Sequence, residues 1–218
     1  MKSFGFDEKI KTNGFKKFKG EKGKKYIGAL VPLSGPDAQD FFKGSATHYH
    51  EGSQKRFLCL SDEDKGIKEH CCTSDYAGSD PVWRIGAVLV LYRVADDNSN
   101  KIVGIADVIP WIFNPTIFTT LKTIFADHGH VDMSFECQDS TYQKFVILPK
   151  KGVMWKNDEK SKSYVMSQAK KQFENLPKQI ATKMSLGEIR EILGGGISSA
   201  EDAASSLDLG SISSSLSG

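Results

Sequence analysis

The alternation of apolar and polar positions predicts a chain built mainly from short β-strands. Segments rich in β-branched or aromatic residues are bounded by Gly, Pro, Asn or Asp, the composition typical of strands. They span residues 25–33, 55–60, 82–94, 101–109, 131–137 and 142–149. The polar sequence ADDNSN separates the third segment from the fourth, so these two are expected to form a hairpin. Six short strands favour a barrel or a sandwich.

Helical spacing of apolar residues predicts one helix between the fourth and fifth strands. Asn114 can cap it, Pro115 suits its first turn and Gly129 supplies the stop. Further helices are expected at 163–176 and 185–193, and the second opens with a capping box. The expected fold is mainly β with α additions: an OB-like barrel of five to six strands with a C-terminal helical extension.

The third strand segment, VWRIGAVLVLYRV, predicts a binding surface through its period of two. Its even-numbered positions include Arg84, Gly86 and Tyr92. A glycine permits close approach of a base, an aromatic ring can stack on it, and a cation can pair with phosphate. We therefore expect this face of the sheet to be open to a nucleic-acid strand, with Trp83 on the opposite, core-facing side.

Charge divides the chain into three parts. Residues 1–26 contain nine lysines and three acidic residues, which predicts a basic N-terminal arm over 1–24. Residues 194–218 contain nine serines, three acidic residues and no Lys or Arg, which predicts a flexible, mildly acidic tail. The remaining 25–193 form the expected core domain. This arrangement suits a protein that binds a polyanion.

The sequence gives no indication of membrane insertion or secretion. It has no apolar run of the length that spans a bilayer, and its start, MKSFGFDEKI, carries charges where a signal peptide has an apolar core. We therefore expect the protein to remain in the reducing cytoplasm. There the four cysteines are expected to be buried, metal-bound or reactive rather than bridged.

Histidines and cysteines concentrate between residues 48 and 72. This stretch holds three of the five histidines and three of the four cysteines. Zinc is bound by four nitrogen or sulfur ligands, and this cluster can supply them. The residues alone do not decide which four side chains bind the zinc ion, because His48 or His70 can take the place of another ligand. The competing interpretation places Cys59 in the core and the histidines at the surface.

The order of these features resembles the T4-type bacteriophage single-stranded DNA-binding (helix-destabilising) proteins. The resemblance rests on the basic arm, the His, Cys and Cys-pair insertion, PWIFNPTIFTTLKTIF, HVDMSFECQDSTYQKFVIL and the acidic tail. It implies an OB fold with a zinc-bearing insertion at about 45–75. The implied zinc ligands are His50, Cys59, Cys71 and Cys72. It also implies an arm used for self-association along the strand and a tail that recruits replication or recombination proteins.

The function expected from the sequence is non-enzymatic binding of single-stranded DNA without sequence specificity, in phage replication, recombination or repair within the infected host cell. Basic and aromatic residues expected to contact the strand are Lys16, Lys17, Lys19, Lys24, Lys25, Lys55, Arg56, Arg84, Tyr92, Arg93, Trp111, Tyr142, Lys144, Lys150 and Lys151. Phe118 and Phe145 are expected in the core.

Other functions fit the sequence less well. A phage transcription accessory factor or a virion nucleic-acid-binding component could use the same barrel. A metal-dependent nuclease would need carboxylates that hold divalent ions. The candidates for that role are Asp107, Asp127, Asp132, Glu136 and Asp139.

Overall fold

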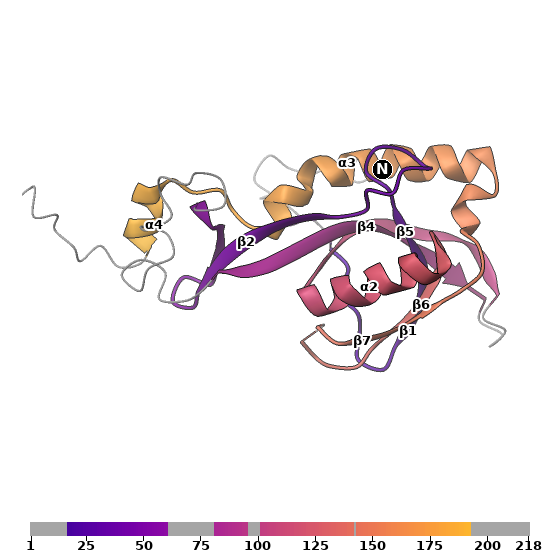
Figure 1. Ribbon diagram of the computed structural model, residues 1–218, viewed down its shortest axis with the longest axis horizontal. Coiled ribbons are helices and arrows are strands. Elements are labelled where there is room, and N and C mark those ends of the chain that lie inside the picture. The colour runs from indigo at the N-terminus through magenta and orange to yellow at the C-terminus, as the bar shows by residue number, and fades with distance from the viewer. Residues whose placement is uncertain (1–16, 61–80, 96–100, 142, 193–218) are drawn as a thin grey trace, which may run out of the picture.

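The computed structural model describes residues 17–60, 81–95, 101–141 and 143–192 (Figure 1). Strands and helices follow one another along the chain in this order: β1 Lys25–Val31, β2 Lys43–His50, β3 Lys55–Leu58, β4 Val82–Val94, β5 Ile102–Phe113, α2 Pro115–His128, β6 Met133–Cys137, β7 Phe145–Pro149, the short 3-10 helix η3 Met154–Lys156, α3 Glu159–Ile180 and α4 Leu186–Ile192.

One antiparallel sheet of seven strands organises the described residues. Its order is β3-β2-β4-β1-β6-β7, and β5 pairs with the other edge of β4. The long strand β4 is the centre: β5 follows it from Ile85 to Val94, while β2 and β1 share its opposite edge. The mainly β fold with α additions is therefore confirmed. The closed OB barrel is not confirmed, because the sheet is open over the part of the chain that the structure describes.

Helices cover both faces of the central strands. On one face, Ile85, Ala87 and Leu89 of β4 pack with buried apolar residues of α2. On the other face, Val88, Val90 and Tyr92 pack against α3. Figure 1 shows the two helices on opposite sides of the sheet. Consequently the middle of β4 is buried on both faces, and the molecule has two main apolar layers.

The prediction that the even-numbered face of β4 is open is wrong. Gly86, Val88 and Val90 are buried beneath α3. A Cβ atom at Gly86 would lie 2.8 Å from Leu176 Cδ1, so this glycine admits the helix rather than a base. On this face the strand is open only near its ends, where Val82 is exposed and Arg84 and Val94 are partly exposed.

Tyr92 is a core residue and not a stacking platform. Its side chain is 6% exposed, and its hydroxyl donates to Asp132 Oδ1 at 2.7 Å and accepts from the Trp155 backbone N–H at 3.3 Å. Asp132 also accepts from the Met154 backbone N–H at 3.1 Å. Burial raises the pKa of Asp132, and the hydrogen bond from Tyr92 opposes that rise. Tyr92 therefore ties η3 to the sheet.

Tyr92→Phe should destabilise the fold without weakening strand binding. The change removes a donor to a buried carboxyl and an acceptor for a backbone N–H, which costs about 1 to 3 kcal/mol of the free energy of unfolding. Urea denaturation measures that loss, and titration with poly-dT measures affinity. A folded Tyr92→Phe variant with clearly reduced affinity would show that this hydroxyl acts in binding.

Local signals position most helix ends as expected. Asn114 accepts from the Ile117 backbone N–H at 3.1 Å at the start of α2, and Gly129 ends the helix at φ 70°. The capping box before α4 is also confirmed: the Ser185 backbone N–H donates to Glu188 Oε2 at 2.8 Å, and the Glu188 N–H donates to Ser185 Oγ at 3.3 Å. The β4–β5 hairpin is confirmed as well.

The segment after α3 ties the β2–β3 hairpin to the body, and we call residues 181–192 the C-terminal strap. Thr182 pairs with the edge of β3: its N–H donates to Arg56 O at 3.0 Å, and its carbonyl accepts from the Leu58 N–H at 3.1 Å. Ile189 of α4 is buried against Ala46, Phe57, Cys59 and Leu60. The strap thus holds the strand that carries Lys55 and Arg56.

No helix in the described ranges is long and apolar enough to cross a membrane.

Candidate nucleic-acid interface

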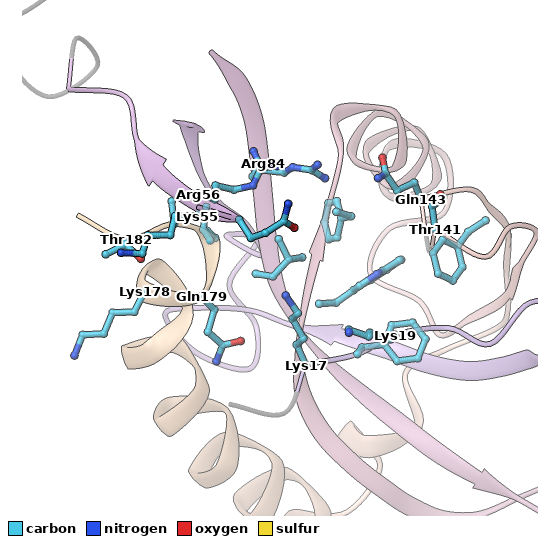
Figure 2. A pocket seen from close by; sticks show the side chains of 18 residues that line it. Lys17, Lys19, Lys55, Arg56, Arg84, Thr141, Gln143, Lys178, Gln179 and Thr182 are labelled. Carbon is cyan, nitrogen blue, oxygen red and sulfur yellow. The ribbon is translucent and has the colours of Figure 1, made fainter. Parts of the chain in front are cut away.

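A cavity of about 480 Å³ lies where the N-terminal segment, the β2–β3 hairpin, the ends of β4 and β5, and the end of α3 meet. We call it the cationic pocket. Figure 2 shows the side chains around it. Its basic residues are Lys17, Lys19, Lys55, Arg56, Arg84 and Lys178. No Asp or Glu is among the described residues that line it. Positive charge is therefore concentrated around this cavity.

Mutual repulsion among these cations is visible in their pKa values. Burial lowers the pKa of Lys17, and the charges of Lys19, Arg56 and Arg84 lower it further. Burial also lowers the pKa of Arg56, with Arg84 as the next cause. An anion in the pocket would relieve this repulsion, because an opposite charge favours the protonated form of each group.

Some polar atoms on the pocket wall have no hydrogen-bond partner in the described part of the protein. Arg84 Nε and both polar side-chain atoms of Gln179 are buried without a hydrogen-bond partner among the described residues. Arg56 differs, since its Nη1 donates to Thr47 Oγ1 at 3.0 Å and its guanidinium lies 5.1 Å from the centre of the Tyr49 ring. A ligand with several acceptor oxygens would satisfy the donors that the protein leaves unpaired.

Aromatic and amide side chains also line the pocket. Its four rings are those of Phe18, Trp111, Phe113 and Phe145. Thr141 and Gln143, from the segment before β7, lie across the hollow from Lys55, Arg56 and Lys178 in Figure 2, on the side where Lys19 also lies. The pocket therefore combines basic side chains with aromatic and amide ones, the combination that suits a nucleotide.

The structure gathers some of the expected contact residues and separates others. Lys17, Lys19, Lys55, Arg56 and Arg84 line the pocket together. Lysines and an arginine that are exposed elsewhere and do not line it are Lys24, Lys25, Arg93, Lys144, Lys150 and Lys151. Lys16 and Tyr142 lie outside the described residues. Sequence reasoning missed Lys178, Gln179, Thr182 and Gln143.

The aromatic expectations need two further corrections. Trp111 lines the pocket but is only 1% exposed, so it supports neighbouring rings and offers no face to a base. Trp83, expected in the core, is 49% exposed near the start of β4, where the strand is not yet buried. Phe118 and Phe145 pack against the core as expected, although each is only partly buried.

Of the implied zinc ligands, two fall within the described residues. Cys59 is buried, and its N–H donates to Ala46 O at 2.9 Å, so it lies beside Ala46. His48 pairs with Phe57 and shares the buried face of the hairpin with Cys59. Such diagonal neighbours lie about 7 to 8 Å apart, a separation that a shared metal can bridge.

His50 is less suitable as a partner for Cys59. It lies four residues beyond Ala46 on β2, about 13 Å at the rise of a strand. Its Nδ1 atom is 2.9 Å from Ser53 Oγ, within the turn that follows. The geometry thus favours His48, the alternative left open by the sequence. Cys71 and Cys72 lie outside the described residues.

The carboxylates considered for a nuclease do not gather. Within the described ranges no group of three His, Cys, Asp or Glu could hold a metal ion. Asp132 is buried with its partners Tyr92 and Met154, and Asp139 caps a turn by accepting from the backbone N–H groups of Gln143 and Lys144 at 3.0 and 3.2 Å. Both of these acids therefore have structural roles.

Comparison with known proteins gives no family for this chain. No family model matches it, and no curated protein sequence does.

Proposed function

We propose that the chain is a single-stranded DNA-binding protein of a bacteriophage replication, recombination or repair system, built on a relative of the OB fold. The observation that carries this proposal is the cationic pocket: its described lining holds six basic side chains and no acidic one, together with the partly buried ring of Phe145. Lysine and arginine hold the phosphate backbone, and aromatic surfaces accept bases, which is how proteins bind single strands of many sequences.

The shape of the pocket favours single strands over duplexes. A base inside a duplex reaches a concave site only after it leaves its stack, at a cost of a few kcal/mol. A single strand presents its bases without that cost. Binding would then protect the strand and shift the melting equilibrium toward the open form, with no chemical step.

Fluorescence anisotropy with labelled poly-dT, duplex DNA and RNA at two salt concentrations tests the proposal. We expect the affinity for poly-dT to exceed that for duplex and to fall as salt rises, because bound counterions are released from the phosphates. Equal binding of duplex and single strand, or binding of neither, would refute it. Weak binding of every probe would favour a virion component instead.

A structural zinc ion in the β2–β3 hairpin is part of this proposal. His48 and Cys59 would provide two ligands on one buried face, and the metal would supply folding energy to a region with a small apolar cluster. Association of copies along the strand and recruitment of replication or recombination proteins by residues 194–218 are further expectations of the resemblance.

Metal analysis distinguishes the two histidines. We expect protein purified without chelator to contain about one zinc per chain, and Cys59→Ser and His48→Gln to lose it. His50→Gln is the matched control and should retain the metal, because His50 lies too far along β2. Retention by His48→Gln together with loss by His50→Gln would reverse this assignment, and zinc-free wild type would remove the site.

A further inference from the structure

The segment that leads into β7 brings an amide and an aromatic ring to the cationic pocket. Gln143 and Phe145 both line the cavity, and Gln143 lies across the hollow from Lys55, Arg56 and Lys178 in Figure 2. Neither is required there by the charge of the phosphate backbone. Their chemistry suits the other half of a nucleotide, the base.

Phe145 is held firmly by its surroundings. Its ring centre lies 5.4 Å from that of Trp111 in an edge-to-face contact and 6.2 Å from that of Phe18. At Gly20 a Cβ atom would lie 2.8 Å from Phe145 Cε1, so the chain passes directly against the ring. Because the ring is only partly buried, the surface left open is a preorganised platform for a base.

Gln143 has a fixed backbone and an exposed side chain. Its N–H donates to Asp139 Oδ1 at 3.0 Å, and its carbonyl accepts from Asn114 Nδ2 at 3.2 Å. The residue is exposed and lines the cavity, so its side-chain amide is accessible to a ligand there. An amide presents one donor group and one acceptor, and side chains of this type read the edges of bases.

We propose that the cationic pocket takes one nucleotide of the strand, with its phosphate on Arg84, Arg56 and Lys17 and its base on Phe145, where Gln143 reads the edge of the base. This subsite rests on the proposed function. The cavity of about 480 Å³ is within the range of small-ligand pockets and accommodates a single nucleotide.

The subsite makes binding selective for the base at one position. Bases differ in the donors and acceptors on their edges, so an amide in a fixed position pairs well with one base and leaves another unpaired. Strands of any sequence still bind through phosphate contacts and stacking. Homopolymers, which present the same base at every register, should expose the preference most clearly.

Anisotropy titrations with short dA, dC and dT homopolymers test the subsite in the full-length protein. We expect the best and worst to differ by at least about 5-fold. Gln143→Ala should remove most of that difference while leaving the salt dependence unchanged. Phe145→Leu should weaken all three by about 5- to 150-fold, because stacking is lost whatever the base. Gln39→Ala, an exposed glutamine outside the cationic pocket, and Phe118→Leu, a partly buried ring on α2, are the matched controls.

The outcomes separate this inference from the proposed function. If wild type binds all three homopolymers equally tightly, or Gln143→Ala keeps the preference, the base subsite is overturned while strand binding stands. If Phe145→Leu weakens binding no more than Phe118→Leu at equal stability, the stacking platform is overturned. If no homopolymer binds better than duplex, the proposed function itself fails.

Discussion

Arg84→Gln should weaken single-strand binding by about 10- to 150-fold at low salt, the value of one charge-assisted hydrogen bond lost. Arg84 lines the cationic pocket, and its Nε atom is buried without a protein partner among the described residues. Loss of one phosphate contact should also flatten the slope of log affinity against log salt by about 0.7.

The same substitution should leave the free protein at least as stable as wild type. The charge of Arg84 lowers the pKa of both Lys17 and Arg56, which means that the cations repel one another in the folded state. Removing one of them relieves that repulsion, a pattern typical of side chains kept for binding and not for stability. Glutamine retains a polar end for the partly buried position.

Arg93→Gln provides the control, because Arg93 is an exposed arginine near the other end of the same strand and does not line the pocket. It should change neither the affinity nor the salt slope. Thermal unfolding of both variants gives the stability. If Arg84→Gln bound poly-dT like wild type, or lost affinity only together with stability, the cationic pocket would not be the strand-binding site.

Sequence reasoning located the cationic side of the pocket because charge is readable without knowing the fold. Lys17, Lys19, Lys55, Arg56 and Arg84 were all expected contacts, although they come from three separate segments. Their convergence could not be read from the sequence, since it depends on how the β2–β3 hairpin pairs with β4. Lys178 and Gln179 were missed because the helix was expected to stop before Pro177.

Local rules explain which elements were predicted. The caps of α2 and α4 depend on residues three positions apart, so the sequence shows them directly. Helix α3 continues past Pro177 because Leu176 and Ile180 are buried against the sheet, and this packing outweighs the local preference. Strand β2, with the sequence KGSATHYH, has little strand character of its own, and pairing with β3 and β4 stabilises it.

The error about Tyr92 has a different origin. Alternation along β4 correctly separated its two faces, since Arg84 and Tyr92 lie on the same side of the strand. A period of two cannot show which face a distant helix will cover, and here each face is covered by one. The signal that was available is the apolar content of both faces of VWRIGAVLVLYRV, which is typical of a strand buried on both sides.

Ile189→Ala should loosen the hairpin that carries Lys55 and Arg56. Ile189 is fully buried against Phe57, Cys59 and Leu60, at the far end of β2 where α4 lies in Figure 1. Truncation of a buried isoleucine costs about 2 to 5 kcal/mol, and here the loss falls on the small apolar cluster that attaches the hairpin to the strap. The hairpin should therefore open at least about 30-fold more often.

Hydrogen exchange measures this opening at two amides. The Leu58 and Thr182 N–H groups make the hydrogen bonds that join β3 to the strap, so both should exchange much faster in Ile189→Ala, while Val90, buried in the centre of β4, keeps its protection. Strand affinity should fall with them, because Arg56 loses its fixed place in the pocket. Ile117→Ala, on the buried face of α2, is the control that lowers overall stability and leaves the strap intact. Unchanged exchange at Leu58 and Thr182 would mean that α4 does not hold the hairpin. Faster exchange with unchanged affinity would mean that the strap holds it but that the hairpin takes no part in binding.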